Sequence, residues 1–595
     1  MDRNTIIGFI LIALVLMVWI WMNAPAPVQE NLSPQDSLTH HTGLTDTTSQ
    51  SKNVSAMIKP ASADSLGRYF SHLAGGREKL FTINTDHVKA EISSKGGTIK
   101  SWELKEFKTW NRYPVNLINQ NMGGDFSLLF YTSDGKLINT KNLDFQPSSQ
   151  INPIINLSEK DSIRLDLVLN VSKKHRIVKS YFFSKDKYGF DVEYTFERMD
   201  SIISNFEYQV AWETGLRYQE RNSIDESGSA MAYSYAGGEL TEIDASAFGE
   251  PPVKQNISGR VKWVATRNKY FGMAIIARDV ESQGAYLEGT RLKMPENGTQ
   301  EYYSVGLKMP FFGKQVETSR FTVFLGPLNF DLVKGFNVDL DRIMSLGAAW
   351  IIRPISEYVM IPLFKFLHLF IPNYGLVIIV FSIIIKIALH PLTKSSMTSM
   401  RKMQALQPMM DEIRGKYKDD PQKMNQQVMR LYKEYGVNPA GGCLPMLLQL
   451  PILYALWSVF RSTIELRQAS FIGWIHDLSV PDVIAKLPFS LPVFNITEVS
   501  GLAVLMGITM FLQQKMSVKD PRQKMMVWLM PVLMTLLFNS FPSGLNLYYF
   551  VFNLLSIGQQ YWINKQHKDE PPRKVEPKKS GGIFARLTKD MPKIK

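Results

Sequence analysis

The distribution of apolar residues divides the chain into two parts of different character. Residues 60–335 alternate apolar and polar positions with a period of two, whereas residues 345–562 are dominated by long apolar runs. Alternation is the pattern of strands with one buried face, and runs of about 17–25 apolar residues are typical of membrane-spanning helices. The sequence therefore predicts a multi-domain membrane protein with a β-rich domain and an α-helical membrane core.

The β-rich domain is predicted over residues 60–335. Short alternating segments separated by Gly, Asn and Asp turns lie at 164–171, 191–197, 260–267 and 320–326. Few helix-length runs separate them. A long series of short strands of this kind favours one large antiparallel β-sandwich.

An apolar run also lies at the N-terminal end of the sequence. "TIIGFILIALVLMVWIWM" (5–22) follows Asp2 and Arg3, and its length predicts a transmembrane helix over residues 1–23. The following "NAPAPV" weakly resembles a cleavage site, so removal of this helix stays an alternative. Residues 24–59 are rich in Pro, Ser, Thr, Gln and Asp, which predicts a flexible linker.

The apolar half begins with a segment that we expect to lie in the membrane interface. Over residues 345–371, four polar side chains (Arg353, Glu357, Lys365 and His368) fall on one side of an otherwise apolar helix. Five further apolar runs predict the transmembrane helices of the core, at 372–392, 441–463, 498–514, 525–541 and 544–563. Residues 464–497 are expected to form a periplasmic loop.

The distribution of Lys and Arg predicts the orientation. These residues are frequent in 393–440, in the linker 515–524 and in the tail 564–595, whereas residues 468–497 hold Lys486 alone. Because cytoplasmic loops carry the excess of positive charge, both termini are expected in the cytoplasm and the β-domain in the periplasm of a bacterium. The basic tail has two interpretations: anchoring on the membrane, or contact with a polyanion such as lipid headgroups or ribosomal RNA.

The cytoplasmic segment 393–440 has its own helical period. Apolar residues three or four positions apart run through both of its halves, interrupted by "DDPQ", and predict a two-helix hairpin. The seam includes Met403, Met410, Ile413 and Met424. It can be ordinary hairpin packing, or a pliable surface for varied apolar segments, because thioethers are flexible.

Polar side chains occur inside the predicted membrane helices. Lys386 lies within "FSIIIKIALHPL" (381–392), and Ser382 shares its helix face. A charge at this depth costs at least about 2.5–3.5 kcal/mol, so it is usually functional or close to an edge. Lys386 is therefore either a cation in a water-filled cavity or a lysine that snorkels to the interface.

Amides accompany this lysine on the other spans. The candidates for a polar lining are Gln449, Asn539, Asn546 and Asn553. In the last span, five residues at spacings of three and four form one polar stripe: Asn546, Tyr549, Asn553, Ser556 and Gln560. Each amide alone is explained by a hydrogen bond between helices. Together, around one cation, they favour a hydrated cavity.

Several classes of function lack support. Cys443 is the only cysteine, which excludes an intramolecular disulfide and cysteine-based metal clusters. Neither a phosphate-binding glycine loop nor a metalloprotease or nucleophile-elbow motif is found, so we expect no enzyme, no cofactor, no metal and no DNA partner. A secondary transporter would show inverted repeats, which we do not find. A membrane-anchored binding module would leave the intramembrane polar residues unexplained.

Four long segments resemble the YidC/Oxa/Alb family of membrane protein insertases. They are "HPLTKSSMTSMRKMQALQP" (390–408), "LYKEYGVNPAGGCLPMLLQLPILYAL" (431–456), "ELRQASFIGWIHDLS" (465–479) and "FPSGLNLYYFVFNLLSIGQQ" (541–560). The resemblance covers about 345–565 closely, and the N-terminal helix and β-domain match the Gram-negative form of the family in outline.

The resemblance implies a five-helix core with a groove open to the cytoplasm and the lipid. Lys386 stands where the family has an arginine that attracts acidic client tails, and Ser382 where it has a polar contact residue. The apolar slide of the family corresponds to Leu447, Leu450, Leu453, Tyr548 and Tyr549. The implied partners are nascent membrane proteins, the bilayer, the Sec translocon and the ribosome, and the implied role is insertion and chaperoning without a nucleotide.

Overall fold

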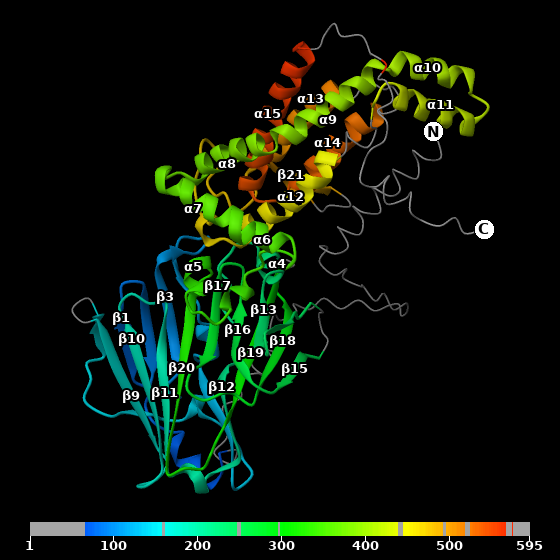
Figure 1. Cartoon of the computed structure of the whole chain (residues 1–595). Helices are drawn as coiled ribbons and strands as arrows, with labels where there is room; N and C mark the ends of the chain where they lie inside the picture. The colour runs from blue at the N-terminus through cyan, green and yellow to red at the C-terminus, as the bar shows by residue number, and fades with distance from the viewer. Residues whose placement is uncertain are drawn as a thin grey trace, which may run out of the picture. The chain divides into compact units, whose positions relative to one another are not determined.

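The computed structural model describes residues 66–157, 161–246, 251–295, 298–437, 444–491, 496–517 and 524–566, together with Lys574. The chain divides into two compact units between Met344 and Ser345, the β unit before and the helical unit after this point (Figure 1). The predicted N-terminal helix, the linker 24–59 and nearly all of the basic tail beyond Gln566 lie outside the described residues.

Three sheets build the β unit. The first has five strands, in the order β4 (Pro114–Asn116), β3 (Ile99–Lys108), β2 (Val88–Ser93), β1 (Leu80–Asn84) and β8 (Ile154–Asn156). The second has nine, in the order β14 (Glu239–Ile243), β13 (Met231–Ala236), β16 (Val261–Arg267), β17 (Phe271–Ala277), β20 (Val316–Pro327), β11 (Gly189–Glu197), β10 (Arg176–Ser184), β9 (Ser162–Asn170) and β7 (Gln146–Pro147). The third has six, in the order β15 (Val253–Ser258), β18 (Gly284–Lys293), β19 (Thr299–Pro310), β12 (Ile203–Trp212), β5 (Ser127–Thr132) and β6 (Leu137–Asn139).

The alternation that predicted these strands is visible in their burial. The four segments singled out in the sequence are observed as β9, β11, β16 and β20. In β11 buried residues alternate with partly exposed ones, and its pairing with β20 is antiparallel throughout. The nine- and six-stranded sheets pack face to face: the Phe196 ring of β11 lies 4.8 Å from the Tyr208 ring of β12. Among the described strand pairs, β1 and β8 are the one parallel pair.

Ten α-helices are described in the helical unit. They are α6 (Ile352–Ile355), α7 (Ile361–Phe370), α8 (Tyr374–Ala388), α9 (His390–Ala405), α10 (Gln407–Lys416), α11 (Pro421–Glu434), α12 (Leu444–Ser462), α13 (Gly501–Ser517), α14 (Lys524–Phe538) and α15 (Ser543–Gln566). Short helices also occur in the β unit, at α3 (Gly67–Phe70), α4 (Ser223–Ser227) and α5 (Phe330–Lys334).

The expected interfacial helix is interrupted. A π-helical turn, Ser356–Met360, separates α6 from α7. Proline lacks an N–H group, so Pro362 cannot donate the usual backbone hydrogen bond to the preceding turn of the helix. The spacing of the backbone hydrogen bonds changes next to it. Within this segment Arg353 pairs with Glu357 at 3.6 Å. Phe364 of α7 packs on Phe381 of α8 with 4.7 Å between ring centroids, which joins the segment to the core.

Length and composition alone identify few spanning candidates among the described residues. Within the part of the chain that the structure describes, no single helix is both long and apolar enough to cross a membrane by itself. The pair Tyr374–Ala388 and Thr393–Ala405 passes when taken together, with a bend of 65°. Val527–Phe538 is a shorter apolar helix. The number of transmembrane helices therefore stays a prediction.

The loop before α13 contains structure that the sequence pattern did not predict. Strands β21 (Val483–Leu491) and β22 (Ile496–Ser500) pair in antiparallel fashion, so residues 498–500 belong to β22 rather than to the start of a helix. The Asp482 carboxylate accepts from the backbone N–H of Leu502 at 2.7 Å and from Trp474 Nε1 at 2.8 Å. By accepting a hydrogen bond from the first turn of the helix, Asp482 caps α13 and fixes its start at Gly501.

Candidate functional site

Lys386 lies on α8 with its side chain directed at α15. It is 7% exposed. Its Nζ donates to Ser556 Oγ at 2.6 Å and lies 4.6 Å from the centre of the Phe552 ring. Ser556 in turn donates to the Phe552 carbonyl at 2.8 Å, so its remaining lone pairs are available to accept from the amine. Among the described residues, the ammonium therefore has one hydroxyl and one aromatic face as its partners.

The orientation of α8 follows from its sequence. Asn373 caps the helix by accepting from the N–H groups of Gly375 and Leu376. Ile378, Phe381 and Ile385 are buried, whereas Ile383 and Ile387 are 38% and 66% exposed. Because positions 382 and 386 share the face of the buried residues, the lysine points into the helical unit.

Ser382 does not share its hydroxyl with the lysine. It is fully buried, and its Oγ donates to the Ile378 carbonyl of its own helix at 2.7 Å. This back-bond is common for serine in apolar helices. The hydroxyl that reaches Lys386 therefore comes from α15, through Ser556.

The polar stripe of α15 is mostly buried. Asn546, Asn553, Ser556 and Gln560 are 0%, 9%, 1% and 3% exposed. Asn546 Nδ2 donates to the Phe538 carbonyl at 3.1 Å, whereas its Oδ1 has no partner among the described residues. Gln560 Nε2 donates to Asn564 Oδ1 at 3.0 Å. A buried amide oxygen without a partner is costly unless water or another ligand reaches it.

The two remaining lining candidates lie elsewhere in the helical unit. Asn539 follows α14 directly; it accepts from the Ser500 N–H at 2.9 Å and donates to the Glu498 carbonyl at 2.8 Å. Both of these bonds fix β22. Gln449 is half-buried on α12. The structure thus brings Lys386 to the polar stripe, while Asn539 is bonded to the unpredicted strand pair.

The five predicted slide residues have different surroundings. Leu450 is 42% exposed, and Leu453 and Tyr549 are half-buried. Tyr548 is fully buried, with its ring centroid 6.2 Å from that of Phe381, because it lies on the face of α15 that packs on α8. The side chain of Leu447 lies outside the described residues.

The methionine seam of the hairpin contributes to the core between α10 and α11. Met410 is 3% exposed and packs with Leu406, Leu431 and Val437, and Met403 and Ile413 cover this cluster. The Tyr432 hydroxyl donates to Met410 Sδ at 3.0 Å. Met424 is only half-buried on α11 and is not among the described members of the cluster.

Sequence reasoning missed two groups close to Lys386. Gln559 Nε2 lies 3.2 Å from His390 Nδ1, which connects α15 to the first residue of α9. Phe552, four residues before Ser556, supplies the ring over the amine. The spacing of Phe552, Ser556 and Gln559 places them on neighbouring positions of one helix face. Only the packing of α8 against α15 shows that this face lies beside Lys386.

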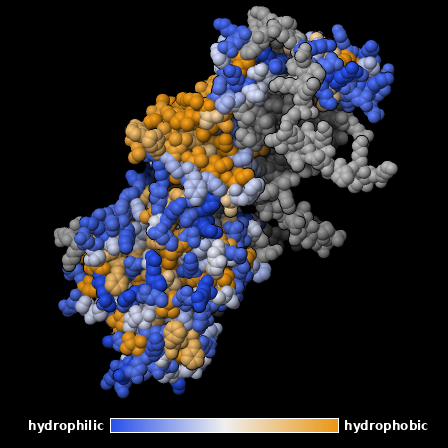
Figure 2. All heavy atoms as spheres, viewed as in Figure 1, coloured by the Kyte–Doolittle hydropathy of each residue, from blue (hydrophilic) through white to orange (hydrophobic). Residues whose placement is uncertain are grey.

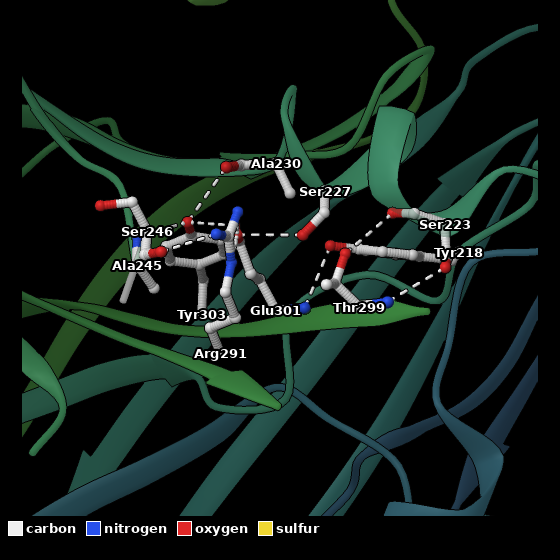
Figure 3. Close-up of polar contacts among 10 residues, drawn as sticks. All are labelled: Tyr218, Ser223, Ser227, Ala230, Ala245, Ser246, Arg291, Thr299, Glu301 and Tyr303. Atoms are coloured by element: carbon white, nitrogen blue, oxygen red, sulfur yellow. Dashed lines mark hydrogen bonds and ion pairs between the residues drawn. The ribbon is translucent and has the colours of Figure 1, made fainter. Parts of the chain in front are cut away.

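The β unit contains a buried ionic cluster of its own (Figure 3). Glu301 Oε1 lies 2.7 Å from Arg291 Nη2, and its carboxylate also accepts from Tyr303 at 2.6 Å and from Ser227 at 3.0 Å. Burial raises the pKa of Glu301, and the hydrogen bond from Tyr303 and the charge of Arg291 oppose that rise. The cluster links Ser227 of α4 to Arg291 of β18 and to Glu301 and Tyr303 of β19, and removing one charge of its ion pair would leave the other buried and unpaired by it.

Comparison with known proteins covers both units. Residues 366–570 match the family model described as 60Kd inner membrane protein, and residues 80–357 match that of the YidC periplasmic domain. The "Membrane protein insertase YidC" of Chloroherpeton thalassium is 40% identical over 96% of this chain and 97% of its own. That of Chlorobium luteolum is 39% identical over 98% and 100%.

A solved structure of an active YidC insertase is 20% identical over 86% of this chain and 99% of its own, with a TM-score of 0.35. The curated relatives extend over both units at nearly full length. The resemblance seen in the motifs is therefore confirmed: the chain belongs to the YidC family, whose members are membrane protein insertases and not enzymes.

Proposed function

We propose that this protein inserts client proteins into a bacterial inner membrane and assists their folding, with its β unit in the periplasm and its hairpin and both termini in the cytoplasm. The observation that carries the proposal is the buried ammonium of Lys386 beside the polar stripe of α15. A cation and several amides inside an apolar helical unit cost free energy, so they are kept for a task in which polar segments enter it.

The chemistry of this task is an exchange of partners at the amine. In the free protein Lys386 donates to a neutral hydroxyl, that of Ser556. A client carboxylate forms a charge-assisted hydrogen bond, which is roughly twice as strong as a bond to a neutral acceptor. An acidic client tail therefore displaces Ser556 and is held beside Asn553 and Asn546, while water hydrates the remaining polar stripe.

The apolar part of the client follows a different surface. Leu447, Leu450 and Leu453 of α12 and Tyr549 of α15 form the slide, and Tyr548 supports it from behind, since it is buried against α8. Moving the client helix from water to lipid yields about 25 cal/mol per Å² of apolar area. The membrane potential acts in addition on charged tails. No nucleotide is needed for these steps.

Cytoplasmic delivery is assigned to the hairpin and the tail. The hairpin α10–α11 receives apolar client segments, with the exposed Met429 beside its packed seam. The basic tail contacts ribosomal RNA, and the Sec translocon cooperates for clients that need it. Gln449 extends the polar lining of the groove toward α12, whereas Asn539 supports its periplasmic end through its two bonds to β22.

Reconstitution tests the proposal. The full-length protein alone in proteoliposomes should insert a small phage-coat-like protein. Lys386→Arg should preserve insertion, because the charge is kept, whereas Lys386→Ala should impair it by about tenfold for clients with acidic translocated tails. Lys394→Ala is the matched control, since Lys394 is an exposed lysine two turns further on. Equal activity of the two alanine variants would reject Lys386 as the client site.

A further inference from the structure

A hollow of about 450 Å³ lies beside Lys386, at the bend between α8 and α9. It is lined by Lys386, Ile387, His390, Pro391, Leu555, Gln559 and Trp562. We infer that it binds the headgroup of an anionic phospholipid of the cytoplasmic leaflet, with the phosphate on Lys386.

The polar side of the hollow suits a phosphate. An ammonium has three N–H donors, and the described residues accept one of them, through Ser556. His390 and Gln559 form the rim, with Gln559 Nε2 and His390 Nδ1 3.2 Å apart. None of the seven lining residues is acidic, so the hollow carries no charge that would repel the phosphate.

The apolar side suits an acyl chain. Leu555 and the exposed Ile387 line the hollow, and Ile387 continues along α8 into the exposed Ile383. Figure 2 shows the surface over α7 and α8 as one apolar area. Trp562, which is 49% exposed, stands at the edge of the hollow, and tryptophan favours the depth of the headgroups. A phospholipid has this combination of a charged head and an apolar tail, whereas free phosphate has only the first part.

This lipid would approach Lys386 through the hollow itself, past Ile387 of α8 and Leu555 of α15. It would be the counter-ion of the amine while no client is bound. The inference requires that Lys386 is accessible from the lipid, and it does not require the client mechanism proposed above.

Native mass spectrometry of the full-length protein in detergent tests the inference without any client. The purified protein is mixed with phosphatidylglycerol and, separately, with phosphatidylcholine, and the retained lipid is counted. We expect phosphatidylglycerol to be retained about tenfold better than phosphatidylcholine, and Lys386→Met to abolish this preference. Lys394→Met, the matched exposed lysine of α9, and Lys386→Arg should keep it.

The outcomes separate the alternatives. No preference in the unmodified protein, or the same preference in Lys386→Met, overturns the inference, whatever the insertion assay gives. Displacement of phosphatidylglycerol by millimolar inorganic phosphate would also overturn it, since it would show a phosphate site without a lipid. If Lys386→Met does not fold, Gln559→Leu decides: a several-fold loss supports the lipid site, and unchanged retention rejects it.

Discussion

Replacing Ser556 with alanine should have opposite effects on stability and on client affinity. Ser556 is the only hydroxyl described within hydrogen-bond distance of the Lys386 amine, and it lies 2.6 Å from it. A hydrogen bond to a charged group contributes about 1.5–3 kcal/mol, and its loss leaves a buried ammonium with only the Phe552 ring. Ser556→Ala should therefore lower the free energy of unfolding by about 1.5–3 kcal/mol.

A double-mutant cycle isolates this interaction. Unfolding is followed by circular dichroism in mixed micelles for the unmodified protein, Ser556→Ala, Lys386→Met and the double variant. In the Lys386→Met background, Ser556→Ala should cost close to nothing, because the hydroxyl then bonds only the carbonyl of Phe552 in its own helix. Equal destabilisation in both backgrounds would refute the interaction, since the coupling free energy would be zero.

The same variant should bind acidic clients more tightly. If the client carboxylate competes with Ser556 for the amine, removing the competitor favours the client, and each 1.4 kcal/mol corresponds to about tenfold in affinity. Insertion measured against client concentration should therefore reach half its maximum at a lower concentration in Ser556→Ala. A higher concentration would show that Ser556 binds the client itself or orients the lysine for it.

Three further predictions concern other parts of the chain. Deleting residues 394–435 should abolish insertion while the remaining helices keep their circular dichroism signal, and normal insertion by a stable deletion would reject a receiving role for the hairpin. Truncation after Trp562 should weaken co-sedimentation with ribosomes, as added salt should, because phosphate contacts release counterions; equal binding would leave only the anchoring interpretation. Lys179→Met should raise the melting temperature of the β unit at neutral pH. Burial lowers the pKa of Lys179 well below 10.5, so the unfolded state binds the proton more tightly than the folded state. The stability of the unmodified domain should therefore increase as the pH rises toward 10.5. In Lys179→Met this increase of stability with pH should be smaller, and an unchanged pH dependence would contradict its assignment to Lys179.

The strands and most helices were predictable because their signal is local. The alternation in β11 records which face is buried, and that pattern survives in the sequence without knowledge of its neighbours β10 and β20. Lys386 was noticeable for the same reason, as one charge in an apolar run. Its partner Ser556 was visible only as one member of the polar stripe.

What the sequence did not predict depends on contacts between distant segments. The start of α13 is set by Asp482, which lies 20 residues before Leu502 and reaches it across β21 and β22. Likewise, periodicity places Tyr548 on a face of α15 but cannot say that α8 covers that face. Gln559 and His390 are 169 residues apart, so the hollow between them exists only once α8, α9 and α15 are packed.

The partners of Lys386 explain how a lysine can serve at a position where the family resemblance places an arginine. An arginine binds carboxylates through a planar fork, and it needs several acceptors when no client is present. The lysine amine is compact, and one hydroxyl and one aromatic face hold it in the free protein. These partners are weaker than a carboxylate or a phosphate, so under the proposals above either anion would replace them at the amine. If Lys386 receives acidic client tails as proposed, a flexible tail needs a charge at this place rather than a fixed geometry, and the weakness of the resting contacts would let the client displace them.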